Sequence, residues 1–116
     1  MAATIYHNPR CSKSRETLKL LREEGVSLEI VEYLKTPPSP SELKSILTKL
    51  GIGARDLMRR KEAPFKTLDL GRESLSEDDL VQAMAENPVL IERPIVVNGE
   101  RAAIGRPPEQ VLEIFK

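Results

Sequence analysis

The sequence predicts an α/β protein in which a mixed four-stranded sheet is flanked by helices. Two observations favour this class. A strand, a helix and a second strand follow one another at the start of the chain, and a strand hairpin followed by a helix lies at its end. Between these segments, apolar side chains recur at helical spacing. The predicted order is therefore β-α-β, an inserted helical portion, and β-β-α.

The first part of the chain supplies the β-α-β segment. Residues 3–7 (ATIYH) are rich in strand-forming side chains, and the following NPR ends the strand. Residues 12–24 place their apolar side chains near one face of a helix, and Gly25 suits the end of that helix. Residues 27–34 (SLEIVEYL) alternate apolar and polar side chains, with less regularity towards the end, and predict a second strand.

The middle of the chain is predicted to be mainly helical. The proline-rich KTPPSPS forms an extended connection, after which Ser41 is the expected N-cap of a helix that ends at Gly51. Residues 54–61 (ARDLMRRK) predict a short helix, and residues 62–71 are expected to be irregular or partly helical. A further helix is expected over residues 76–87, with Ser76 as its N-cap and acidic residues in its first turn.

The last part of the chain carries the clearest turn signal. Two apolar runs in RPIVVNGERAAIG surround Asn98-Gly99, a pair that suits a type I′ hairpin turn. Pro107 and Pro108 open a final helix, whose expected inward side chains are Val111, Leu112 and Phe115. The complete order of elements is that of a thioredoxin-like core. We expect one domain over residues 1–116.

Composition narrows the class of function. The 116 residues include 18 basic and 18 acidic side chains, so the net charge is zero, which argues against bulk attraction to nucleic acid or to a membrane surface. No apolar run approaches the roughly 20 residues needed to span a bilayer, and the N-terminal residues lack the features of a signal peptide. A lone cysteine cannot form an internal disulfide, so we expect a reducing, cytoplasmic location. One cysteine and one histidine are also too few for a typical zinc site, and we expect no metal.

The single cysteine, Cys11, lies in the stretch HNPRCSKSR, between the first strand and the first helix. Backbone N–H groups at the start of a helix stabilise negative charge, but only modestly at exposed sites. Fixed cations must add to that effect, and Arg10, Lys13 and Arg15 are close in sequence. Two interpretations are open: a nucleophilic thiolate held by these groups, or an inert, small buried side chain.

Two spacings exclude common thiol chemistries. Ser14 occupies the position of the second cysteine in a C-x-x-C motif, so the chain is not a dithiol oxidoreductase. Thr17 stands where the C-x5-R phosphatase loop needs arginine. With no second cysteine in the sequence, an oxidised Cys11 must be resolved by a thiol from another molecule.

Several motifs together resemble the glutaredoxin-linked arsenate reductases. They are IYHNPRCSKSRETL, YLKTPP, LMRRKEAPF, NPVLIERPIVV and IGRPPE, which follow the order of that family with similar spacing from Thr4 to Val111. The uninterrupted HNPRCSKSRETL and RPPEQVLEI are most similar to a short bacterial, arsenate-reductase-like branch.

The resemblance implies a thioredoxin-like fold with an inserted helical portion and a catalytic cysteine at Cys11. It implies that three arginines hold the oxyanion and that four loop residues support the thiol: Arg59, Arg93 and Arg106 for the first group, and His7, Asn8, Ser14 and Arg15 for the second. Arg60 remains an alternative to Arg59. The Arg93–Pro94 bond falls where thioredoxin-like folds carry a cis-proline.

The implied reaction is the reduction of arsenate to arsenite. Cys11 would form a thiolate–arsenic adduct, which glutathione as co-substrate and glutaredoxin as partner would resolve, with no bound cofactor. Phosphate or sulfate would bind as analogues of arsenate. Two alternatives share the fold: a thiol redox protein with another small substrate, and a transcriptional regulator that binds RNA polymerase. The second is weakened by Ser14, which replaces the cysteine of the usual redox switch.

Overall fold

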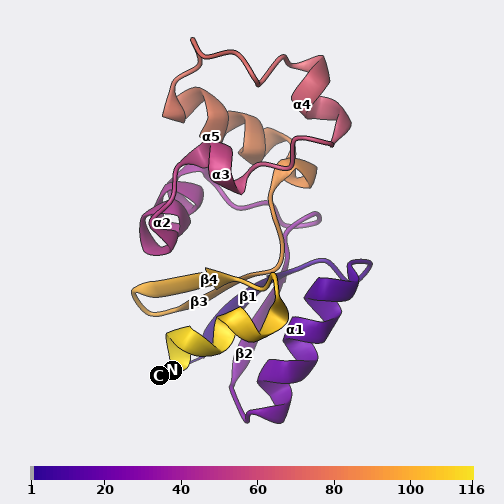
Figure 1. The fold of residues 1–116 in the computed structure, drawn as a ribbon, viewed down its shortest axis with the longest axis vertical. Coiled ribbons are helices and arrows are strands. Elements are labelled where there is room, and N and C mark those ends of the chain that lie inside the picture. Colours follow the sequence, from indigo (N-terminus) through magenta and orange to yellow (C-terminus); the bar gives the residue numbers. More distant parts are fainter. Residues whose placement is uncertain (1) are drawn as a thin grey trace. The chain divides into compact units, whose positions relative to one another are not determined.

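A computed structural model describes residues 2–116. The chain divides into two compact units. The sheet unit comprises the residues up to Thr36 together with Arg93–Lys116, and the helical unit comprises Pro37–Glu92. Figure 1 labels the elements, whose bounds are β1 (Ala3–His7), α1 (Ser12–Glu23), β2 (Leu28–Glu32), α2 (Pro40–Leu50), α3 (Ala54–Leu57), α4 (Ala63–Thr67), α5 (Glu77–Glu86), the 3₁₀ helix η1 (Pro88–Leu90), β3 (Ile95–Asn98), β4 (Arg101–Ile104) and the 3₁₀ helix η2 (Pro108–Phe115).

The sheet unit contains the mixed four-stranded sheet that the sequence predicted. The strand order is β2-β1-β3-β4, with β1 parallel to β2 and antiparallel to β3, and β3 antiparallel to β4. Ile5 in the central strand β1 pairs with Ile30 of β2 on one side and with Val96 of β3 on the other. The parallel pair is joined by α1, as a parallel connection requires. The predicted β-α-β and β-β-α segments therefore meet in one sheet.

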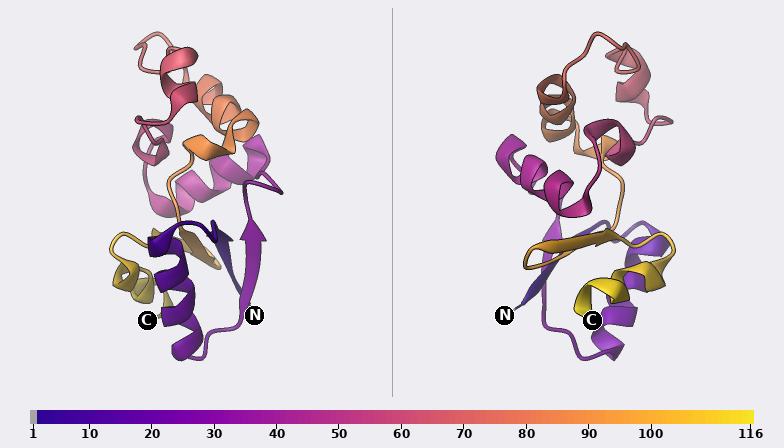
Figure 2. Two further views of the ribbon diagram at one scale, coloured as in Figure 1. Left: turned by 90° about the vertical axis from the view of Figure 1, so that its right-hand side faces the viewer. Right: turned by 60° about the vertical axis from the view of Figure 1, so that its left-hand side comes forward.

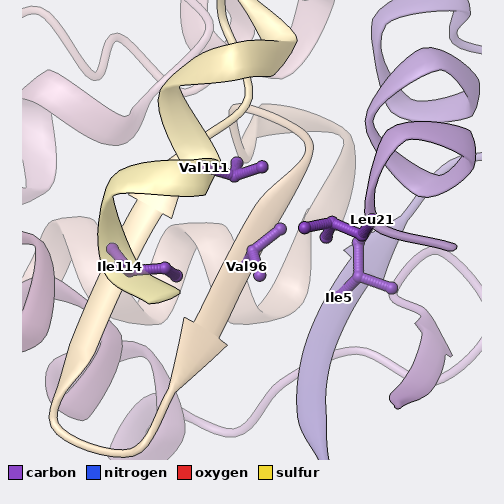
Figure 3. Close-up of a cluster of buried hydrophobic side chains, with 5 residues drawn as sticks. All are labelled: Ile5, Leu21, Val96, Val111 and Ile114. Carbon is purple, nitrogen blue, oxygen red and sulfur yellow. The ribbon is translucent and has the colours of Figure 1, made fainter. Parts of the chain in front are cut away.

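The core of the sheet unit lies on one face of this sheet. Helices α1 and η2 cover that face together (Figures 1 and 2). Five side chains from β1, α1, β3 and η2 meet there and are almost fully buried, as Figure 3 shows: Ile5, Leu21, Val96, Val111 and Ile114. Of the three side chains of η2 that the sequence predicts to point inward, Val111 is in the cluster, whereas Leu112 and Phe115 are only partly buried against it. Ile114, which was not predicted, is the second η2 side chain in the cluster.

Two helices of the helical unit begin with capping boxes. Ser39, and not the expected Ser41, is the N-cap of α2: its hydroxyl accepts from the Glu42 N–H, and Glu42 Oε1 accepts from the Ser39 N–H. Pro40 then occupies the first helical position, which its fixed φ favours. Ser76 caps α5 as predicted, with Asp79 as its reciprocal partner. Gly51 ends α2 in the left-handed region, with φ of 71°.

The hairpin turn differs from the prediction by one residue. Asn98 pairs with Arg101, so the two central turn residues are Gly99 and Glu100. Among the described turn residues, only Gly99 has a positive φ, of 61°. That pattern belongs to a type II′ turn, which needs glycine at the first central position alone, and it corrects the expected type I′ turn at Asn98-Gly99.

Candidate active site

The turn between β1 and α1 is fixed by its own backbone. The Cys11 N–H donates to the carbonyl of Asn8 at 3.0 Å, and the Arg10 N–H donates to Asn8 Oδ1, also at 3.0 Å. Asparagine followed by proline favours such a turn because its side chain bonds to the backbone two residues on. Cys11 is the N-cap of α1, with an extended backbone, and its carbonyl accepts from the Arg15 N–H. Its sulfur therefore stands at the positive end of α1.

Arg106 contacts this sulfur. Its Nη2 lies 3.6 Å from Cys11 Sγ, while its Nε donates to the carbonyl of Arg93 at 2.8 Å. Cys11 is 8% exposed. The buried Nε of Arg93 has no hydrogen-bond partner among the residues that the structure describes. The sheet unit thus brings together the predicted residues Cys11, Arg93 and Arg106. The sulfur is buried beside a guanidinium group, and not sealed in hydrocarbon.

The proline bonds next to these arginines are both cis. The Arg93–Pro94 bond is cis, which confirms the sequence prediction, and the Arg106–Pro107 bond, which was not predicted, is cis as well.

His7 and Ser14 form a buried polar pair behind the turn. Ser14 is fully buried, its Oγ lies 2.6 Å from His7 Nδ1, and it accepts from the Asn8 N–H at 3.0 Å. A buried hydroxyl hydrogen needs an acceptor, which assigns Nδ1 as the acceptor and leaves the proton of neutral His7 on Nε2. Burial lowers the pKa of His7 below its usual 6.5, and Arg22 and Arg15 add to this effect, while Glu32 opposes it. His7 is therefore neutral at pH 7.

Two of the cations near Cys11 in sequence, Lys13 and Arg15, make other contacts. Arg15 Nη1 donates to the carbonyl of Pro9 at 3.0 Å and so braces the turn. Lys13 lies 3.8 Å from Glu16 on the exposed side of α1. The guanidinium contact to the sulfur comes instead from Arg106, which is 95 positions away in sequence.

Gly105 is a residue that sequence reasoning missed. A Cβ added there would overlap Thr17 Oγ1 and lie 2.8 Å from Pro94 Cγ. Thr17 cannot easily give way, because it is buried and its hydroxyl donates to the Lys13 carbonyl. Glycine therefore lets the segment that carries Arg106 pass close to α1. The only sequence signal was the glycine that directly precedes arginine in IGRPP.

Arg59 belongs to the helical unit. Its N–H donates to the carbonyl of Leu90 at 2.7 Å, which fixes its backbone. Its side chain is 22% exposed, with Nη1 3.3 Å from Glu92 Oε1 and Nε 3.4 Å from Glu62 Oε2. Arg60 is exposed. Of the two neighbouring arginines, Arg59 is the one whose position the structure fixes.

Within residues 2–116, no three side chains of histidine, cysteine, aspartate or glutamate gather where they could hold a metal ion. None of the helices described is long and apolar enough to cross a membrane.

Comparison with known proteins gives consistent matches along the chain. The model of the ArsC family matches residues 6–114. An arsenate reductase from Haemophilus influenzae is 53% identical, over 99% of this chain and all of that protein. The uncharacterized protein YfgD from Escherichia coli is 61% identical, over 95% of this chain and 93% of that protein. The solved structure of an arsenate reductase from Vibrio cholerae is 56% identical, covers 98% of both chains and superposes with a TM-score of 0.95.

Proposed function

Because the chain belongs to the ArsC family, we propose that it reduces arsenate to arsenite through a Cys11 thiolate–arsenic adduct that glutathione and glutaredoxin resolve. The observation that carries the proposal is the contact between Arg106 Nη2 and the Cys11 sulfur at the start of α1. A single thiol suits a reducing compartment, so we infer a cytoplasmic location.

In the first step, the Cys11 thiolate attacks arsenic(V). A sulfur–arsenic bond forms, and one arsenate oxygen leaves as water after taking up protons. The N-terminal N–H groups of α1 and the Arg106 guanidinium stabilise the attacking thiolate. The unsatisfied, buried Nε of Arg93 is a donor suited to an oxyanion, because such a donor otherwise stays unpaired at a cost. His7 and Ser14 hold the turn in place through the Asn8 N–H.

In the second step, the glutathione sulfur attacks the Cys11 sulfur. The electron pair of the sulfur–arsenic bond passes to arsenic, which leaves as arsenite, and a mixed disulfide joins Cys11 to glutathione. Glutaredoxin then takes the glutathione by thiol–disulfide exchange and restores the Cys11 thiolate. In total, the thiols of glutathione and glutaredoxin are oxidised to one mixed disulfide as arsenic(V) becomes arsenic(III). The scheme needs no second cysteine, as the sequence requires.

Arg59 is proposed as a further ligand of the oxyanion. Its planar guanidinium can bind an oxyanion with two parallel hydrogen bonds. Glu62 and Glu92 now balance its charge, so an oxyanion would compete with these carboxylates. An arsenate ligand at Arg59 therefore requires that at least one carboxylate be displaced or protonated.

The test measures arsenite formed by purified protein with arsenate, glutathione, glutaredoxin and a source of reductant. Cys11→Ser is the matched control. We expect turnover that depends on every component and is absent in the control. If the protein gives no arsenite beyond Cys11→Ser, the proposal is wrong. If its Cys11 nonetheless reacts rapidly with glutathione disulfide, the result supports a thiol redox protein with a different substrate.

A further inference from the structure

A cavity of about 190 Å³ lies beside the turn that carries Cys11. One wall is the turn itself, from His7 to Arg10, and the other is formed by Glu32, Leu34 and Lys35 at the end of β2. All of these residues belong to the sheet unit. The cavity is smaller than the roughly 300–1,000 Å³ of a complete small-molecule site, so it would hold one part of a ligand.

The charges that line the cavity have both signs. Arg10 and Lys35 are exposed cations, and Glu32 is a carboxylate whose Oε1 lies 3.7 Å from Lys35 Nζ. Leu34 adds an apolar surface that is 43% exposed. An ammonium and a carboxylate on one carbon atom, as in a free α-amino acid, match this arrangement: the carboxylate would face the cations, and the ammonium would face Glu32.

The position of the cavity fits the need for an external thiol. Arg10 directly precedes Cys11, and the Asn8 carbonyl accepts from the Cys11 N–H, so the wall and the thiol belong to one hydrogen-bonded turn. In extended glutathione, the γ-glutamyl and cysteinyl groups span roughly 7 Å, at about 3.5 Å per residue. A thiol tripeptide seated by its γ-glutamyl end can therefore bring its sulfur to the neighbourhood of the turn.

We propose that this cavity is the subsite for the γ-glutamyl end of glutathione, held by Lys35 and Arg10 at its carboxylate and by Glu32 at its ammonium. The inference rests on the proposed function in one respect, which is that glutathione is the second thiol. It adds where that thiol is recognised, and by which side chains.

The test needs no arsenate. Purified protein is mixed with glutathione disulfide, and the rate at which Cys11 gains glutathione is followed by mass spectrometry. In this exchange, the Cys11 thiolate attacks one sulfur of the disulfide, forms the mixed disulfide and releases one glutathione thiolate. Bis(2-hydroxyethyl) disulfide, which is uncharged, is the reference reagent. For each variant, the rate with glutathione disulfide is divided by the rate with this reagent.

Lys35→Gln is expected to lower this ratio about two- to fivefold, the range of a single exposed charge pair. Lys19→Gln is the matched control, because Lys19 is an exposed lysine of α1 that does not line the cavity. It removes the same charge and should leave the ratio unchanged. If Lys35→Gln leaves the ratio unchanged, or if Lys19→Gln lowers it equally, the subsite proposal is overturned.

Glu32→Gln separates recognition from simple attraction. Glutathione disulfide is an anion, so attraction alone predicts that removing a carboxylate raises the ratio. A carboxylate that holds the ammonium predicts a fall of about two- to fivefold. A rise would overturn the assignment of Glu32. Because the assay contains no arsenate, a protein that fails to reduce arsenate can still pass this test, and the two failures are distinguishable.

Discussion

Arg106 Nη2 lies 3.6 Å from Cys11 Sγ, while the Nε of the same guanidinium group donates to the carbonyl of Arg93. One side chain thus links the sulfur at the start of α1 to Arg93, two residues before β3. The hydrogen bond to the Arg93 carbonyl helps to orient the guanidinium group whose Nη2 lies at the sulfur.

Replacing Arg106 with glutamine should lower kcat/KM for arsenate reduction about 10- to 100-fold. A hydrogen bond to a charged group contributes about 1.5–3 kcal/mol, and each 1.36 kcal/mol in the barrier is tenfold in rate. Arg101→Gln is the control, because Arg101 is exposed on β4 and donates to the Lys116 carbonyl. Equal kcat/KM in Arg106→Gln and the unmodified protein would contradict the role of the contact.

Stability should fall as the pH drops below 6.5. The pKa of buried His7 is lower in the folded protein than in the unfolded chain, so the unfolded chain binds a proton first. The free energy of unfolding is therefore at its full value above pH 6.5 and decreases from there towards the lower folded pKa. Urea denaturation between pH 5.5 and 7.5 measures it. His7 is the only histidine, so the slope should vanish in His7→Gln, and the same slope in both proteins would refute the prediction.

A methyl group at position 105 should destabilise the protein by about 1–3 kcal/mol, the usual cost of overfilling a packed site. In Gly105→Ala the new Cβ meets Thr17 and Pro94, so the Arg106 segment must move away from α1. Gly71→Ala is the control, because its Cβ would make ordinary contact with Phe65 at 3.6 Å. Chemical denaturation measures the free energy of unfolding of both variants. A tolerated Gly105→Ala would show that the close approach is not needed.

The two serines before α2 should differ in their effect. Ser39→Ala removes the N-cap side chain and should lower the free energy of unfolding by about 1 kcal/mol. Ser41→Ala replaces an exposed residue inside the first turn, where alanine is the better helix former, so little change or slight stabilisation is expected. Urea titration of the two variants decides between the cap positions, and a larger loss in Ser41→Ala would restore the original assignment.

The expectation of one domain over residues 1–116 is tested by comparing two probes of unfolding. Both tyrosines of the sequence, Tyr6 and Tyr33, lie in the sheet unit, whereas α2 and α5 belong to the helical unit. Tyrosine fluorescence therefore reports one unit, and far-UV circular dichroism reports helices of both. We expect the two urea transitions to coincide, as for a cooperative domain. Separate midpoints would show that the units unfold independently.

Much of the fold could be predicted from local patterns. The strand over Ala3–His7 and the helix capped by Ser76 were found because each depends on side chains that are close in sequence. The N-cap of α2 was misplaced by two residues because serine occurs at both 39 and 41, and only Ser39 has glutamate three residues on. The predicted turn type was wrong because the glycine at position 99 can be either the second or the first central residue of a two-residue turn. The pairing of Asn98 with Arg101 makes it the first, with Glu100 as the second.

The site was harder to predict because its charges come from distant segments. Arg10, Lys13 and Arg15 are near Cys11 in sequence, yet the structure uses Arg15 to brace Pro9 and pairs Lys13 with Glu16. The resemblance to a family pointed to Arg106, whereas no local pattern could place its guanidinium at the sulfur. Gly105 escaped notice because the reason for a glycine there, the nearness of Thr17 and Pro94, exists only in three dimensions.

The long separation between the sulfur and its guanidinium has a consequence for biosynthesis. Cys11 leaves the ribosome 95 residues before Arg106, and β1 must wait for β3 before its antiparallel edge is paired. Throughout that interval, the nascent chain carries Cys11 without the contact to Arg106. The guanidinium contact to the sulfur can therefore form only after residues 93–106 have emerged and folded against the first part of the chain.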